Sequence, residues 1–152
     1  MNISFFIVII LMAFSAFARE EDVLVLTQRN FETAITENKL ILVAFYAPWC
    51  RYSQELLPEY AKAAGILAQK SSPFKLAKVD ATIEVSLANK FGVEGFPTLI
   101  FFHNGKPFQF NGGRTADTII LWLETNFAVE NNEVTSVEAF VQTEGNLNFL
   151  TV

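Results

Sequence analysis

Residues 40–53 read Leu40-Ile41-Leu42-Val43-Ala44-Phe45-Tyr46-Ala47-Pro48-Trp49-Cys50-Arg51-Tyr52-Ser53. The apolar run from Leu40 to Tyr46 is typical of a central strand that is buried on both faces of a helix-covered sheet. Cys50 follows this strand at the expected start of a helix, and it is the only cysteine of the chain. Ligands and reacting groups collect at the carboxyl ends of strands in open α/β sheets. This stretch therefore predicts both the centre of the fold and its functional site.

The chain on either side of this stretch alternates between strands and helices. Apolar runs bounded by turn residues predict strands, and apolar residues at helical spacing predict helices. The expected strands are 23–26, 40–46, 74–79, 98–102 and 108–110, and the expected helices are 27–38, 50–70, 84–90 and 115–127. Asn104-Gly105 is expected as a hairpin turn. Pro58 falls inside the second helix, where a proline should bend the helix or interrupt a hydrogen bond. The order βαβαβαββα predicts an α/β fold.

Four segments resemble, in order and spacing, the catalytic domain of the protein disulfide isomerase family. They are Leu42 to Cys50, Leu76-Ala77-Lys78-Val79-Asp80-Ala81-Thr82, Gly95-Phe96-Pro97-Thr98 and Gly112-Gly113-Arg114. The resemblance covers about Val23 to Phe127, and four agreeing segments are far more specific than one short motif. It implies the thioredoxin fold, a central mixed sheet covered by helices. The Cys-Arg-aromatic-Ser form also resembles the family's thiol-retention chaperones of the early secretory pathway.

Two positions depart from the catalytic pattern of this family. Ser53 stands where the family has a second cysteine, and a hydroxyl cannot resolve the mixed disulfide that the first thiolate forms. Ala44 stands where the family has a buried glutamate, a neighbour of the lysine matching Lys78, that relays the proton of the resolving cysteine. Without that proton, an unpaired buried carboxylate would only reduce stability. The site is therefore expected to capture a thiol partner but not to release it alone.

Cys50 is the predicted catalytic residue, and its neighbours are assigned to two roles. A helix amino terminus favours the thiolate, to which Ser53 can still donate a hydrogen bond. Arg114 matches the family arginine that tunes the second cysteine, so Ser53 and Arg114 are assigned to thiolate tuning, with a solvated loop position as the alternative for Arg114. The residues assigned to client binding are Trp49, Tyr52, Phe96 and Pro97. The resemblance implies that Pro97 is a cis-proline facing Cys50.

The two ends of the chain are expected to lie outside this domain. Residues 3–17 are apolar and uncharged, and Ala16-Phe17-Ala18 has the small-x-small form that signal peptidase cuts. Residues 1–18 are predicted to be a secretory signal peptide, with a signal anchor as the alternative, and residues 19–127 the thioredoxin domain. About 15 apolar residues fall short of the roughly 20 that span a bilayer, so no stable membrane insertion is expected after cleavage. Residues 128–152 are predicted to be a linker and the truncated beginning of a second thioredoxin-like domain.

Composition limits the kinds of partner. The net charge is −5 and the sequence pI is about 4.9, and no cluster of lysines and arginines offers a stripe for phosphates, so a nucleic-acid partner is not expected. His103 has no cysteine or carboxylate companions at metal-ligand spacing. Neither a metal nor a cofactor is therefore expected.

The resemblance implies a protein-folding factor of the endoplasmic reticulum lumen, or a secreted one. Its expected partners are folding secretory proteins with free thiols or disulfides, and glutathione is a further candidate. The expected activity is that of a thiol-capturing chaperone or weak isomerase, since isomerisation needs only one attacking thiolate while dithiol oxidation needs two. Two alternatives stay open: a non-redox module that holds peptides around Trp49 and Pro97, and a truncated fragment of a longer isomerase.

Overall fold

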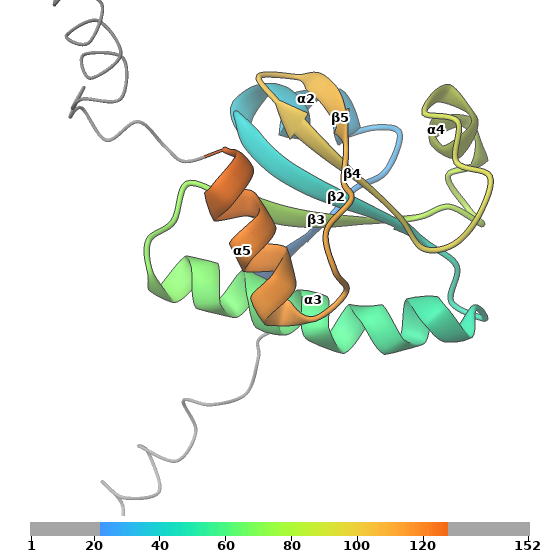
Figure 1. Cartoon of the computed structure of the whole chain (residues 1–152). Helices are drawn as coiled ribbons and strands as arrows, with labels where there is room; N and C mark the ends of the chain where they lie inside the picture. The colour runs from blue at the N-terminus through green and yellow to red at the C-terminus, as the bar shows by residue number, and fades with distance from the viewer. Residues whose placement is uncertain (1–21, 128–152) are drawn as a thin grey trace, which may run out of the picture.

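The computed structural model describes residues 22–127, in which one five-stranded sheet is covered by helices (Figure 1). The strands are β1 (Val23–Val25), β2 (Leu40–Tyr46), β3 (Lys75–Asp80), β4 (Thr98–His103) and β5 (Lys106–Gln109). The helices are α2 (Phe31–Glu37), α3 (Arg51–Gln69), α4 (Val85–Lys90) and α5 (Ala116–Asn126). The expected signal peptide and the expected start of a second domain lie outside the described residues. Between residues 22 and 127, no helix is both long and apolar enough to cross a membrane.

The observed order of elements confirms the predicted α/β fold, while several boundaries differ. The first helix was expected from Thr27 but begins at Phe31, because the Asn30 side chain accepts a hydrogen bond from the Thr27 N–H at 2.7 Å and holds a turn there. The last strand was expected at 108–110 and lies at 106–109, directly after the predicted Asn104-Gly105 turn. Both turn residues have positive φ, 50° and 76°, as a tight hairpin turn requires. Helix α3 continues through Pro58 as one helix.

The strand order is β1-β3-β2-β4-β5, which places β2 inside the sheet. Strands β1 and β2 run parallel to β3, whereas β4 runs antiparallel to β2 and β5. The loop that follows β2 and the loop that precedes β4 therefore lie at the same end of the strands, because Phe45 is the partner of Thr98. This topology brings Cys50 and Pro97 to the same end of the sheet, at the carboxyl end of β2.

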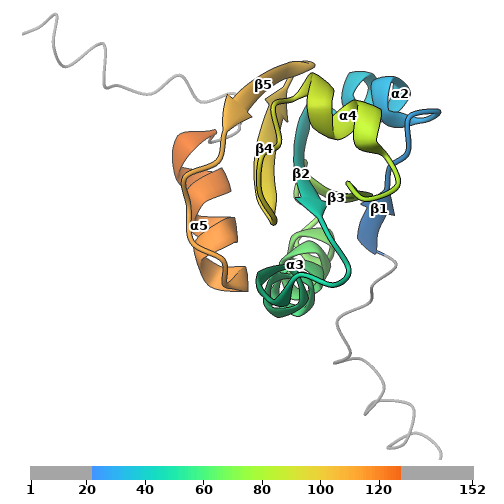
Figure 2. The ribbon, with the colours of Figure 1, turned by 90° about the vertical axis from the view of Figure 1, so that its right-hand side faces the viewer.

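The helices cover both faces of the sheet, with α3 and α5 on one side and α2 and α4 on the other (Figure 2). Successive residues of β2 point to opposite faces, as in any strand. Leu42 and Ala44 enter the core under α3 and α5, while Ile41, Val43 and Phe45 enter the core under α2 and α4. All five side chains are buried, which confirms the prediction of a central strand covered on both faces.

Tyr60 fixes helix α3 to the sheet. Its hydroxyl lies 2.7 Å from the carbonyl oxygen of Leu42 on β2 and 3.1 Å from that of Ala77 on β3. The side chain is fully buried, and burial raises the pKa of the phenol well above its usual value, so the hydroxyl stays protonated and donates. This contact holds the helix that begins after Cys50 against the two strands that lead toward the site.

Candidate functional site

Cys50 caps the amino end of α3, at the end of a short loop that leaves β2. The loop closes where the Cys50 N–H donates to the Ala47 carbonyl at 3.0 Å, and the helix begins where the Gln54 N–H donates to the Cys50 carbonyl at 3.0 Å. The Gln54 side chain also donates to the Pro48 carbonyl at 2.8 Å. These bonds fix the backbone on both sides of the thiol. The side chain of Cys50 thereby stands at the first turn of a long helix.

The thiol of Cys50 faces the loop that precedes β4. Its Sγ atom lies 3.4 Å from the carbonyl oxygen of Phe96, to which the S–H can donate. The bond between Phe96 and Pro97 is cis, as the sequence resemblance implies, and Pro97 is buried. The Thr98 hydroxyl donates to the Gly95 carbonyl at 2.7 Å and closes this loop. The thiol and the cis-proline loop thus form one continuous site.

Ser53 lies one helical turn after Cys50 and is fully buried. Its Oγ atom accepts a hydrogen bond from the Ala47 N–H at 3.3 Å, so it is tied to the loop between β2 and α3. The side chain therefore has a fixed position in the first turn of α3, next to the loop that carries the thiol. It supplies a hydrogen-bonding hydroxyl there, which has no redox chemistry.

The pKa of the Cys50 thiol is lowered from its usual value of 9.0. The largest cause is the hydrogen bond from the backbone N–H of Ser53, and smaller contributions come from the Ser53 side chain, the N–H of Tyr52 and the charge of Arg114, while desolvation opposes them. Unsatisfied N–H groups at a helix amino terminus favour an anion in this way. The arrangement can therefore produce a nucleophilic thiolate.

Aromatic side chains are exposed on both sides of the thiol. Trp49 is 72% exposed and Tyr52 is 60% exposed. The Trp49 ring meets the half-buried Phe96 ring edge-to-face, with centroids 6.0 Å apart, so it bridges the helix side and the proline side of the site. The residues that the sequence assigned to client binding are thus placed around one thiol. That they bind clients remains a prediction.

Ala44 lies in the core below this site. It is fully buried on β2, and its register partners are Lys78 on β3 and Leu99 on β4. Ala44, where the resemblance implies a buried glutamate in the family, is thus a small apolar side chain in the core, in register with Lys78. Within residues 22–127, no group of three or more histidine, cysteine, aspartate or glutamate side chains could hold a metal ion.

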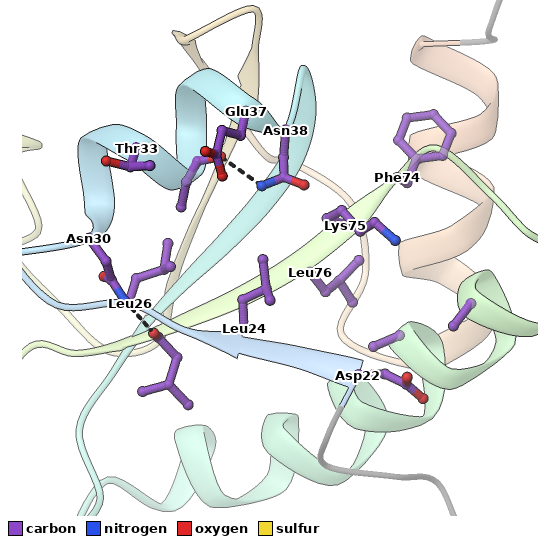
Figure 3. A pocket seen from close by; sticks show the side chains of 14 residues that line it. Asp22, Leu24, Leu26, Asn30, Thr33, Glu37, Asn38, Phe74, Lys75 and Leu76 are labelled. Atoms are coloured by element: carbon purple, nitrogen blue, oxygen red, sulfur yellow. Dashed lines mark hydrogen bonds between the residues drawn. The ribbon is translucent and has the colours of Figure 1, made fainter.

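A hollow of about 450 Å³ lies at the β1 edge of the sheet, between α2 and the end of α3 (Figure 3). Its wall includes Asp22, Leu24 and Lys75. The dashed lines in Figure 3 mark the bonds of Asn38 to the Ala34 carbonyl at 2.8 Å and of Asn30 to the Val25 carbonyl at 3.1 Å. Both side chains donate to backbone carbonyls four or five residues earlier in the chain, so they stabilise the local backbone. None of the residues predicted to act around Cys50 lines this hollow, so it is separate from the thiol site.

Two contacts of the site have no signal in the sequence. The acceptor for the Cys50 thiol is a backbone carbonyl, which residue types do not reveal. Arg114, from the loop before α5, lies over the Tyr52 ring, with its Cζ atom 5.7 Å from the ring centre. The sequence assigned these two residues to separate roles. The structure brings them together because α3 and α5 lie on the same face of the sheet (Figure 2).

Comparison with known proteins finds relatives of this chain among thioredoxin domains and protein disulfide isomerases. The thioredoxin family profile matches residues 22–125. The protein disulfide-isomerase of Drosophila melanogaster is 52% identical over 118 residues, and that of Oryctolagus cuniculus is 51% identical over 111 residues. These matches cover 78% and 70% of this chain, which spans only 24% of the fly protein and 22% of the rabbit protein.

Solved structures agree with these matches. The first thioredoxin domain of mouse protein disulfide-isomerase A4 superposes with a TM-score of 0.65 at 35% identity, covering 78% of this chain and 86% of that domain. The zinc-bound form of human ERp44 superposes with a TM-score of 0.65 at 25% identity, covering 68% of this chain and 30% of that one. Cys50, the single cysteine, fits a variant of the site that such domains carry.

Proposed function

Since this chain belongs to the thioredoxin family and its relatives are protein disulfide isomerases, we propose that it is a secretory-pathway folding factor that captures client proteins through Cys50. The observation that carries the proposal is the position of the thiol. Cys50 caps α3, the pKa of its thiol is lowered, and its sulfur faces the cis-proline loop, while the residue one helical turn later is a buried serine, which cannot resolve a captured client.

The chemistry that this site supports is thiol-disulfide exchange with one protein thiol. The Cys50 thiolate attacks one sulfur of a client disulfide, a new sulfur–sulfur bond forms between Cys50 and the client, and the other client sulfur leaves as a thiolate. That client thiolate, or another thiolate of the same client, can then attack the client sulfur of the mixed disulfide. A client disulfide forms again and the Cys50 thiolate is regenerated. The exchange isomerises client disulfides without net oxidation.

The same chemistry limits what the chain can do alone. Net oxidation of a client dithiol requires a disulfide on the enzyme, and a site with one cysteine cannot form one internally. Release of a captured client therefore depends on the client's own thiols or on a small thiol such as glutathione. We propose that the protein holds clients longer than a two-cysteine isomerase does.

Exposed aromatic rings support a contribution from non-covalent binding. Trp49 and Tyr52 remain exposed on either side of Cys50, where they can contact apolar side chains of an unfolded client. A non-redox peptide-binding module is the second candidate function, because these rings would remain useful without the thiol. The two candidates differ in whether capture depends on sulfur.

Trapping of adducts separates the two candidates. The tagged chain is expressed in the secretory pathway of a eukaryotic cell, thiols are blocked with N-ethylmaleimide at lysis, and adducts are compared on non-reducing and reducing gels. We expect reducible high-mass adducts with the wild type and none with Cys50→Ser. The matched control is Cys50→Ser combined with Gln69→Cys, which moves the single thiol to the exposed far end of α3. Adducts that are equally abundant with this control would show nonspecific reactivity and would overturn the proposal.

A further inference from the structure

Tyr52 and Arg114 meet beside the thiol although they come from distant parts of the sequence. Tyr52 lies in the first turn of α3, and Arg114 precedes α5. The Arg114 Cζ atom is 5.7 Å from the centre of the Tyr52 ring, within the range over which a cation is attracted to an aromatic face. Both side chains are exposed, so packing in the core does not fix the position of the guanidinium.

We infer that Tyr52 is a positioning residue, whose ring holds the Arg114 guanidinium on the Cys50 side of the loop before α5. The inference rests on the proposed function of Cys50 as the reacting thiol. In this arrangement, a ring two residues after the thiol recruits a cation from another element. The ring holds the cation in place, and the cation stabilises the negative charge of the Cys50 thiolate.

The backbone on either side of Arg114 is held firmly, which leaves only the side chain to be placed. A Cβ atom added at Gly113 would lie 2.5 Å from the Thr118 hydroxyl, so the loop packs directly on α5. The Thr115 N–H donates to Thr118 Oγ1 at 3.1 Å. The Ala116 N–H donates to the carboxylate of Glu59 on α3 at 2.7 Å. The base of the Arg114 side chain is therefore fixed relative to α3, and its long flexible stem is what the Tyr52 ring orders.

The neighbouring charges explain why the position of Arg114 matters. Arg51 is adjacent to Cys50 in the sequence, but its Nε donates to the Glu55 carboxylate at 2.9 Å and is paired away from the thiol. Glu94 is exposed on the loop that leads to Phe96. Of the charged side chains between residues 22 and 127, Arg114 is the one whose charge lowers the pKa of Cys50. Releasing its guanidinium from the ring would weaken that effect.

The pH dependence of Cys50 alkylation tests this inference directly. Because Cys50 is the only cysteine, the rate with iodoacetamide reports its thiolate fraction without a client or a second thiol. The purified reduced chain is compared with Tyr52→Leu, Tyr52→Phe and Arg114→Gln. We expect Tyr52→Leu and Arg114→Gln each to slow alkylation about twofold below the midpoint, a modest change because exposed charges are screened. Tyr52→Phe keeps the ring and should alkylate as the wild type does.

A double variant and a charge control complete the test. Adding Tyr52→Leu to Arg114→Gln should cause no further slowing, since the ring would then have no cation to hold. Arg51→Gln removes the same charge from a residue paired with Glu55 and should shift the midpoint less than Arg114→Gln does. An unchanged midpoint in Tyr52→Leu, or equal slowing by Tyr52→Leu with and without Arg114, would overturn the inference. If the wild type and all of these variants fail to capture clients in the adduct-trapping experiment, that result would count against the proposed function instead.

Discussion

The sulfur of Cys50, the N-cap residue of α3, lies 3.4 Å from the carbonyl oxygen of Phe96, the residue before Pro97. The thiol and this carbonyl form a hydrogen bond. The thiol can donate to that carbonyl, whereas the thiolate receives N–H donors from Ser53 and Tyr52 instead. The rings of Trp49 and Phe96 meet beside this point, with their centroids 6.0 Å apart.

Restoring a second thiol should convert the site from capture to turnover. The buried Ser53 side chain lies in the first turn of α3, one turn from Cys50, so Ser53→Cys should allow an internal disulfide to form. We expect the oxidised variant to lose both thiols toward N-ethylmaleimide and to oxidise client dithiols over many turnovers. The measurement is the count of alkylated thiols by mass spectrometry, followed by a dithiol oxidation assay.

Gln69→Cys serves as the matched control for this variant. Gln69 is the last residue of α3 and is exposed, so a thiol there lies far from Cys50. It should add a second alkylatable thiol and little dithiol oxidation. If Ser53→Cys keeps two free thiols in an oxidising buffer, the position does not place a second sulfur within reach of Cys50.

The stability of the reduced protein should depend on pH through Cys50. The pKa of its thiol in the folded protein is lowered from the value of 9.0 expected after unfolding. The stabilisation is therefore present in full above pH 9.0 and is lost as pH falls through the lowered value. We expect the difference in unfolding free energy between wild type and Cys50→Ala to shift in favour of the wild type as pH rises. Urea unfolding at several pH values measures it, and a difference that is constant across pH would contradict the lowered pKa.

Removing the Tyr60 hydroxyl should destabilise the fold but not alter the thiol. Tyr60→Phe leaves the carbonyls of Leu42 and Ala77 without this buried donor, at an expected loss of roughly 1–3 kcal/mol in unfolding free energy. The midpoint of Cys50 alkylation should stay where it is. Tyr46→Phe is the control, since Tyr46 is only half-buried at the end of β2. Equal loss of stability in the two variants would argue against a special role for the Tyr60 bridge.

Filling the space beside Gly113 should loosen the start of α5. A Cβ at this position would meet the hydroxyl and Cβ of Thr118 at 2.5 and 2.8 Å, and Thr118 forms the capping box of α5 with Thr115. We expect Gly113→Ala to lower the free energy of unfolding by about 1 kcal/mol, as loss of a helix cap does. Gly95→Ala is the control, because a Cβ there has no neighbour within 4 Å. Thermal unfolding of both variants checks the difference, and equal melting temperatures would contradict the steric argument.

Much of the fold could be predicted because local pattern and global fold agree. Leu40 to Tyr46 is an unbroken apolar run, and only a strand covered on both faces can bury all of it. The helix boundaries were less certain from sequence. The polar residues Thr27 to Asn30 lead into the helical pattern without a break, and what keeps them out of α2 is the hydrogen bond that the Asn30 side chain accepts from the Thr27 N–H. Such a bond depends on a local geometry that periodicity does not contain.

The site, like the fold, has properties that could be predicted from the sequence and others that could not. The residue types around Cys50 predicted a thiolate at a helix start with no second thiol, because those properties depend on neighbours in the sequence. The resemblance to a known family implied Pro97 and Phe96 as its partners. The acceptor carbonyl of Phe96 and the distance of the sulfur to it required the strand order that sets β4 beside β2. No pattern of residue types encodes that distance.

The sequence by itself determined which reactive groups are available at the predicted site: a single cysteine, Cys50, with Ser53 three residues after it and Ala44 in the apolar run before it. These are covalent facts about the chain, and they hold in any conformation. The tertiary structure alone decided which groups from distant parts of the chain act on the sulfur. Arg114 reaches the Tyr52 ring only because α3 and α5 pack on the same face of the sheet, and electrostatic effects at a half-buried thiol open to water fall off steeply with distance.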